Sequence, residues 1–267
     1  MTRATRSTQS QLDAALARLR AAPHRTLLLD YDGTLAPIVA LPSQAAPDAA
    51  LLELLAGLAG EPNTALHVVT GRSQASIEPW LGSLRIWLHV EHGLHARRPD
   101  GAWLTPTRQR PAQLDRLAAL FATFAIRIPG SLVEHKTSSI AFHYRRAAAR
   151  DVAEIMPRLR IELASALGPD VELLEGRKVW EVRARGVSKR SAVELAIAAA
   201  PVGTQLLAVG DDRTDEDMFA ALPDAADSIH IGPGPSAAKL RLRSPDELRS
   251  LLARLGTAID PCAPNGR

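Results

Sequence analysis

The residues best suited to chemistry in this sequence are aspartates that gather in two short segments far apart in the chain. The first segment holds Asp30 and Asp32, and the second holds Asp211, Asp212 and Asp215. Carboxylates this close repel one another, and burial adds the cost of removing them from water. A divalent cation offsets both effects, and Mg²⁺ takes hard oxygen ligands of this kind. The sequence therefore predicts a Mg²⁺ site formed by these five aspartates, with Asp212 and Asp215 bound either directly or through water.

The segments that precede these aspartates predict how they meet. Continuous apolar runs, typical of strands covered on both faces, end at Asp30, Thr70 and Asp211. Ligands bind outside the carboxyl ends of parallel strands, so neighbouring strands would bring these three residues to one place. For any single segment, a polar turn after a strand is an equally good explanation of Asp followed by Gly.

Strand-like and helix-like segments alternate at both ends of the chain, which predicts an α/β fold with a parallel sheet. The expected strands are 26–29, 65–69, 86–90, 205–209 and 228–231. The expected helices are 11–22, 47–59 with Pro47 near its first turn, one from about residue 73, and 245–255. The middle differs, with helices over 111–126 and 149–167 among strand-like pieces at 131–136, 139–145, 171–174 and 178–183. We therefore expect an inserted α+β unit over 106–185 and a core built from 1–105 and 186–267.

The string Asp-x-Asp-Gly-Thr at residues 30–34 resembles the first motif of the haloacid dehalogenase superfamily, whose phosphatases use an aspartate nucleophile. The resemblance implies that Asp30 attacks phosphorus to form an aspartyl-phosphate, and that Asp32 is the general acid and base. It also implies a parallel-sheet core with helices on both faces and an inserted cap that closes over the site. The residue types suit this chemistry, because a carboxylate is ionised at neutral pH and needs no activating base.

Three further segments resemble the other motifs of that superfamily. Thr70 matches the second-motif hydroxyl that binds a phosphate oxygen, and the Gly71 and Arg72 that follow are expected to contact substrate. Lys189 matches the third-motif lysine, which stabilises charge on the nucleophile and the phosphoryl group. A solvated lysine at a helix start is the alternative for that residue. Residues 210–219 match the metal-binding fourth motif, and the alternative is an acidic helix start favoured by the helix dipole.

The expected inserted unit resembles the cap of trehalose-6-phosphate phosphatases. That family carries a Glu-x-Lys pair, a His-Tyr-Arg strand and a later Glu, which match Glu134, Lys136, Arg145 and Glu181. A Glu-His-Gly segment resembles the His-Gly that the family carries after its second motif, and it adds His92. The resemblance implies that these five residues bind substrate. A solvated strand face or an ion pair is the alternative for each cap residue taken singly.

Together these resemblances imply a Mg²⁺-dependent phosphatase that hydrolyses trehalose 6-phosphate through an aspartyl-phosphate, with a trehalose-phosphate synthase as a candidate partner. One alternative is a phosphatase of the same superfamily that acts on sucrose phosphate or glucosylglycerol phosphate. The other is a non-catalytic domain that binds a sugar phosphate or a synthase.

Composition argues against several other classes of protein. The 267 residues are 46% apolar and 23% charged, which is typical of a globular chain. The net charge is only +3 although the pI is 9.4, and no basic stripe is present, so we expect no nucleic-acid partner. No apolar run reaches about 18 residues, so we expect no membrane segment. The lone Cys262 and the polar start favour a cytoplasmic location. We expect His24, His67 and His89 to be surface or core residues.

Overall fold

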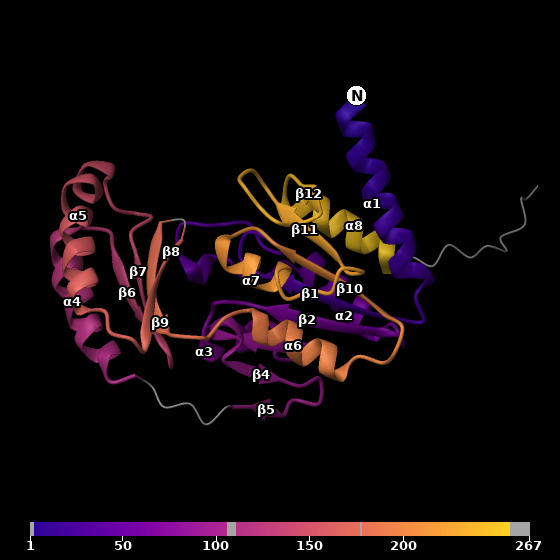
Figure 1. The fold of residues 1–267 in the computed structure, drawn as a ribbon, viewed down its shortest axis with the longest axis horizontal. Helices are drawn as coiled ribbons and strands as arrows, with labels where there is room; N and C mark the ends of the chain where they lie inside the picture. The colour runs from indigo at the N-terminus through magenta and orange to yellow at the C-terminus, as the bar shows by residue number, and fades with distance from the viewer. Residues whose placement is uncertain (1–2, 106–110, 177, 257–267) are drawn as a thin grey trace, which may run out of the picture.

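Two β-sheets, each with its own helices, organise the chain (Figure 1). The computed structural model describes residues 3–105, 111–176 and 178–256. Cys262 and the expected start of the inserted unit at residue 106 lie outside those ranges. Within them, no helix combines the length and the apolar character that crossing a lipid bilayer requires.

The larger sheet has eight strands, of which six are parallel and two at one edge are antiparallel. In spatial order they are β12 (Leu240–Leu242), β11 (Asp227–Ile231), β10 (Thr204–Gly210), β1 (His24–Asp30), β2 (Thr64–Val69), β3 (Trp87–Val90), β4 (His95–Arg97) and β5 (Trp103–Leu104). The predicted parallel sheet is confirmed. The sequence did not predict β4, β5 and β12, because strands of two or three residues carry no periodic signal.

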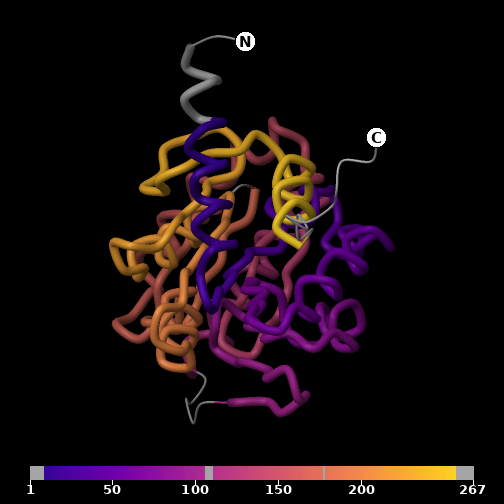
Figure 2. The backbone as a smooth tube through the Cα atoms, turned by 90° about the vertical axis from the view of Figure 1, so that its right-hand side faces the viewer, coloured from indigo at the N-terminus to yellow at the C-terminus, as the bar shows by residue number. Residues whose placement is uncertain are grey.

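Helices cover both faces of this sheet. Successive residues of a strand point to opposite faces, and each face has its own hydrophobic cluster shared with helices. Leu27 and Leu29 belong to one cluster, and Leu28 belongs to the other. The first cluster includes side chains of α1 (Arg3–Ala21), α2 (Ala49–Gly60), α3 (Gln74–Leu81) and α8 (Pro245–Gly256). The second includes side chains of α6 (Arg190–Ala199) and α7 (Glu216–Phe219). The predicted helices on both faces are therefore confirmed, and α1 and α8, from opposite ends of the chain, lie side by side (Figure 2).

The smaller sheet has four strands and is antiparallel throughout. In spatial order they are β6 (Leu132–His135), β7 (Ser139–His143), β9 (Val179–Ala184) and β8 (Val171–Gly176). The helices α4 (Gln113–Arg127) and α5 (Ala149–Ala166) cover one face, where Phe121, Phe142 and Trp180 belong to a separate hydrophobic core. The opposite face turns toward the larger sheet (Figure 1). Side chains at every second strand position are therefore directed between the two sheets.

Two helices begin at residues other than those expected. The helix α2 begins at Ala49 and leaves Pro47 outside its first turn, because Asp48 caps it by accepting the N–H of Leu51 at 2.7 Å. The helix α1 begins at Arg3 instead of near residue 11. Its first residues are mostly polar, so they offer no apolar periodicity from which a helix could be predicted.

His67 on β2 and His89 on β3 form a buried pair. Nδ1 of His67 lies 2.9 Å from Nε2 of His89, and each residue is only 1% exposed. Trp87 stacks against the ring of His67. Burial lowers the pKa of His67 well below its usual value and lowers the pKa of His89 to about 4. Both rings are therefore neutral at pH 7 and belong to the core.

We expect the free energy of unfolding to fall as the pH drops from about 6.5 toward 4, because both histidines bind protons more readily in the unfolded chain. For His89 alone, the loss is on the order of 2 kcal/mol at pH 5. Urea unfolding at pH 7 and pH 5 measures the loss in the wild type and in a His67→Leu, His89→Leu double variant. The double variant should lose less stability on acidification. An equally steep loss in the two proteins would contradict this explanation.

Candidate active site

Asp30 and Lys189 form the centre of the site at the carboxyl edge of the larger sheet. Asp30 is the last residue of β1, and Lys189 immediately precedes α6. Nζ of Lys189 donates to Oδ1 of Asp30 at 2.6 Å and to Oδ1 of Asp215 at 2.7 Å. All three residues are almost fully buried. Lys189 is therefore not a solvated lysine at a helix start, and it binds Oδ1 of Asp30 rather than Oδ2.

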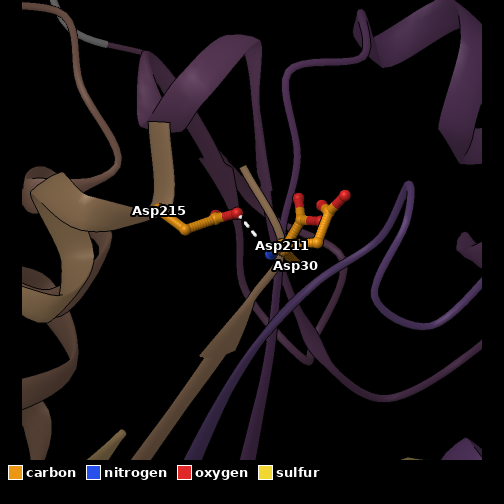
Figure 3. A group of neighbouring side chains, drawn as sticks. All are labelled: Asp30, Asp211 and Asp215. Atoms are coloured by element: carbon orange, nitrogen blue, oxygen red, sulfur yellow. Dashed lines mark hydrogen bonds between the residues drawn. The ribbon is translucent and has the colours of Figure 1, made fainter. Parts of the chain in front are cut away.

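Asp30, Asp211 and Asp215 form a cluster of oxygen donors (Figure 3). One carboxylate oxygen from each residue lies within 4.8 Å of the others. Burial raises the pKa of Asp30 to about 7, against the opposing effect of Lys189, and raises the pKa of Asp211 to about 9. The neighbouring carboxylates add to both shifts. Hard oxygen donors that repel one another in a buried site fit a divalent metal ion, which would favour their ionised forms.

The close approach of these carboxylates depends on two glycines. A Cβ on Gly33, whose φ is +87°, would lie 2.1 Å from Oδ2 of Asp211. A Cβ on Gly210 would lie 2.1 Å from Cγ of Asp215. Asp215 is held further by its Oδ2, which accepts the N–H groups of Asp211 and Asp212 at 2.9 Å each. Asp215 therefore shapes the loop after β10 through its Oδ2 and orients Lys189 through its Oδ1, which accepts from Nζ.

Asp32 and Asp212 lie outside the oxygen cluster. Nε and Nη2 of Arg72 donate to Oδ2 and Oδ1 of Asp32, each at 2.7 Å. The guanidinium of Arg72 also lies over Trp80, 4.7 Å from the ring centroid. Asp212 caps the short helix η3 (Arg213–Asp215), where its side chain accepts a backbone N–H. Among the residues that the structure describes, neither side chain joins the three clustered carboxylates. Their predicted metal contacts stay predictions.

The loop after β2 carries Thr70, Gly71 and Arg72 to the same edge of the sheet. Thr70 is buried, and its Oγ1 accepts the N–H of Arg72 at 3.1 Å. Gly71 lies against His92, because a Cβ at that position would be 2.6 Å from Cε1 of the ring. The structure therefore brings Gly71 and His92 together, although the two residues follow different strands and the sequence analysis did not predict this contact.

A second polar network, centred on Glu181, lies on the face of the smaller sheet that turns toward the larger one. Nζ of Lys136 donates to Oε1 of Glu181 at 3.0 Å, and Oγ of Ser139 donates to the same oxygen. Nε2 of His92 lies 3.2 Å from Oε2. Burial alone would raise the pKa of Glu181, but Lys136 and His92 hold it well below its usual value. Glu181 is therefore a buried anion whose charge a lysine balances.

The sequence analysis did not identify Ser139 and His143, which contact two of the predicted carboxylates. Ser139 donates to Glu181, and Nε2 of His143 lies 2.8 Å from Oε2 of Glu134. Alternate residues of a strand share one face, and both residues lie on β7 at positions of the same parity. That alternation, followed back along the strand from Arg145, is the signal that could have identified them.

A cleft of about 660 Å³ joins the two networks. Asp30, Lys189 and Asp211 line its floor on the larger sheet, and Lys136 and Glu181 line its roof on the smaller sheet. The volume lies in the range of about 300–1,000 Å³ that is typical of small-ligand sites. Other predicted residues that line it are Asp32, Gly71, Arg72, His92, Glu134, Arg145 and Asp212. Thr70 and Asp215 are the predicted residues that the lining does not include.

Known proteins are similar to this chain in sequence over most of its length. A sequence model of the trehalose-phosphatase family matches residues 28–246. The bifunctional trehalose-6-phosphate synthase/phosphatase of Thermoproteus tenax is 41% identical over 238 residues, which are 88% of this chain and 32% of that protein. The trehalose-6-phosphate phosphatase of Escherichia coli is 31% identical over 241 residues, which are 89% of each chain. The chain spans about a quarter to a third of the length of several other curated relatives.

Solved structures share the fold. The C-terminal domain of trehalose-6-phosphate phosphatase from C. albicans matches with a TM-score of 0.82 at 26% identity, covering 92% of this chain and 96% of that one. A haloacid dehalogenase-like hydrolase from Bacteroides thetaiotaomicron matches with a TM-score of 0.63 at 15% identity, covering 87% and 99%, which confirms the predicted fold alone. Since the matched region runs from β1 into α8 and includes both acidic segments and the smaller sheet, the chain belongs to the trehalose-phosphatase family.

Proposed function

We propose that this protein hydrolyses trehalose 6-phosphate to trehalose and phosphate through an aspartyl-phosphate. The observation that carries the proposal is the cleft that joins Asp30, bound by Lys189, to the polar network around Glu181. The floor offers a carboxylate nucleophile beside a buried cation, and the roof offers donors and acceptors for sugar hydroxyls. The names of two relatives, from Thermoproteus tenax and Escherichia coli, support the same substrate.

In the first half-reaction, Oδ2 of Asp30 attacks phosphorus, the P–O bond to the sugar breaks, and the sugar oxygen takes a proton from Asp32. Lys189 binds the other oxygen of Asp30 and offsets negative charge that develops on the phosphoryl group. We propose that Thr70 and Gly71 bind phosphoryl oxygens; Gly71 lines the cleft, and Thr70 is buried directly before it in the chain. In the second half-reaction, Asp32 takes a proton from the water that attacks phosphorus. Phosphate then leaves, and Asp30 is restored.

Arg72 controls the freedom of Asp32 in this scheme. It binds both carboxylate oxygens of Asp32, so Asp32 has to leave Arg72 before it can carry a proton to the sugar oxygen. Arg72 lines the cleft, and its planar group with several N–H donors suits phosphate oxygens as well as carboxylates. We propose that bound substrate takes over the N–H groups of Arg72 and so releases Asp32.

We propose Mg²⁺ as the metal ion of the site. Asp30 and Asp211 would hold it, with Asp215 and Asp212 bound directly or through water, and Asp32 belongs to the proposed set as well. When bound, the ion supplies positive charge that offsets these carboxylates and the phosphoryl oxygens. The all-oxygen donor set and the raised pKa values of Asp30 and Asp211 support this assignment.

We propose that the inserted unit, residues 106–185, is a cap that selects the sugar over the core formed by 1–105 and 186–267. Its sugar-binding residues would be Glu134, Lys136, Arg145 and Glu181, with His92 contributed by the core. Carboxylates accept hydrogen bonds from sugar hydroxyls, and lysine and arginine donate to their oxygens. All five side chains line the cleft, which supports the assignment.

A trehalose-phosphate synthase is the partner that we propose. The name of the Thermoproteus tenax relative joins synthase and phosphatase in one longer protein, of which this chain matches 32%. A separate synthase that binds this phosphatase would bring the two activities together in the same way. We propose a cytoplasmic location for this protein, which the single cysteine, Cys262, supports.

Replacing Asp30 with asparagine should abolish turnover while the fold survives. The amide is a poor nucleophile, so the rate of phosphate release should fall by more than about a thousandfold. Circular dichroism and thermal unfolding would show whether the variant is folded. Unchanged turnover in a folded Asp30→Asn protein would refute the nucleophile assignment.

Removing divalent metal with a chelator should abolish phosphate release, and added Mg²⁺ should restore it. Because an ion that binds only the folded state stabilises it, saturating Mg²⁺ at about 100 times its dissociation constant should add about 2.7 kcal/mol of stability. Differential scanning calorimetry with and without Mg²⁺ measures this effect. Asp211→Asn should lose most of the Mg²⁺-dependent stabilisation. Full activity in the presence of the chelator would rule out the metal site.

Replacing Glu134 with alanine should damage hydrolysis of trehalose 6-phosphate far more than hydrolysis of p-nitrophenyl phosphate, because the aryl group makes no sugar contacts. We expect a loss of roughly ten- to hundredfold in kcat/KM for the sugar substrate. Glu154→Ala, which changes an exposed carboxylate on α5 outside the cleft, is the matched control. Equal losses on both substrates would mean that Glu134 does not bind the sugar.

A further inference from the structure

Glu91 is a buried carboxylate that the steps above do not use. It lies just after β3 in the short helix η2 (Glu91–Gly93), and it is 2% exposed. Its φ is 49°, in the left-handed region that residues other than glycine rarely adopt, and that of His92 is 57°. The N–H of Glu91 donates to the carbonyl of Arg72 at 2.9 Å. An unfavourable backbone conformation is therefore maintained beside the loop that follows β2.

The side chain of Glu91 crosses from the larger sheet to the smaller one. Oε1 accepts the N–H of Thr137 at 3.1 Å, and Oε2 accepts the N–H of Ser138 at 3.0 Å and its hydroxyl at 3.4 Å. Thr137 and Ser138 are the turn between β6 and β7, which the N–H of Lys136 closes by donating to the carbonyl of Ser139. The N–H of the buried Ser138 needs an acceptor, and Glu91 supplies one for it and another for the more exposed Thr137.

The turn that Glu91 binds is flanked by two residues of the roof. Lys136 precedes the turn and Ser139 follows it, and both donate to Oε1 of Glu181. Because Glu91 holds the two N–H groups that lie between them, it also fixes the backbone positions from which the side chains of Lys136 and Ser139 reach Glu181. The turn is 46 residues away from Glu91 in sequence, so this contact does not stabilise local structure around η2.

A contact between the smaller sheet and α7, which packs on the larger sheet, allows a comparison of strength. Arg183 on β9 lies 3.6 Å from Asp217 on α7, and the Asp217 side chain is 42% exposed. Exposed ion pairs at such distances contribute little, because solvent screens them. The Glu91 contact is buried, shorter and made by a carboxylate to backbone donors, which is the stronger kind of hydrogen bond.

We propose that Glu91 is a positioning residue that docks the β6–β7 turn on the larger sheet and thereby sets Lys136 and Glu181 for binding the sugar. The sugar-binding part of this inference rests on the proposed function, whereas the docking part does not. Glu91 touches neither substrate nor the reacting atoms. It acts through the turn, and its loss affects the roof of the cleft while the phosphoryl floor keeps its own contacts.

Steady-state kinetics on two substrates test the sugar-binding part. Glu91→Ala should raise the KM for trehalose 6-phosphate about tenfold or more, because charge-assisted hydrogen bonds that hold the turn are lost. For p-nitrophenyl phosphate, kcat/KM should stay within about twofold of the wild type, because floor contacts are unchanged. Glu91→Gln keeps one acceptor oxygen and should recover part of the loss. Asp217→Asn is the matched control, since it removes the weaker contact between the smaller sheet and α7, and it should behave like the wild type.

Amide hydrogen exchange in the substrate-free protein tests the docking part. Thr137 and Ser138 should exchange about tenfold faster or more in Glu91→Ala than in the wild type or Asp217→Asn. Unchanged exchange overturns the docking, and equal losses on the two substrates overturn the role in sugar binding. Should the wild type leave trehalose 6-phosphate intact, the proposed function fails while exchange still decides the docking. Should Glu91→Ala not fold, Glu91→Gln decides both parts by the same measurements.

Discussion

The site depends on how one ammonium group lies among two buried carboxylates and a third that is partly buried. Asp30, Asp211 and Asp215 meet within 4.8 Å, and Lys189 donates to two of them. Burying like charges together is unfavourable unless positive charge lies among them. The surrounding structure meets that requirement through several local features. The strands β1 and β10 are neighbours, two glycines leave room for the carboxylates, and Lys189 stands immediately before α6.

The floor and the roof of the cleft differ in how their charges are balanced. This difference suits the floor to binding a cation and the roof to hydrogen bonding with hydroxyl groups. On the floor, three carboxyl groups lie around the single positive charge of Lys189, and burial raises the pKa values of Asp30 and Asp211, so a bound cation would favour their ionised forms. On the roof, Lys136 balances Glu181, and His92 is neutral because burial lowers its pKa. The roof therefore needs no ion. Its charged groups are held in place and can offer directional hydrogen bonds to hydroxyl groups.

The sequence predicted the features that depend on composition and spacing along the chain. Apolar runs ending at Asp30 and Asp211 predicted two strands of a parallel sheet, because that signal is local. The acids were expected to cluster on the condition that these strands are neighbours, which the spacing alone did not determine. The bidentate contact of Arg72 with Asp32 could not be predicted, since spacing does not specify where a long side chain points. Glu91 was overlooked for a related reason. Its partners are backbone N–H groups, which leave no signature in the identity of distant residues.

The pairing of the central strand also bears on how a nascent chain reaches this structure. The strand β1 pairs with β2, which follows soon after it, and with β10, which comes after the whole smaller sheet in chain order. Contacts within the smaller sheet are closer in sequence, and nearby partners meet at lower entropic cost than distant ones. During translation, β6 to β9 can therefore pair while β1 still lacks a neighbour on one side. The carboxylates at the ends of β1 and β10 meet only after β10 has left the ribosome. A chain that stops before β10 would therefore contain Asp30 but lack the aspartates that surround it, even if its smaller sheet had folded.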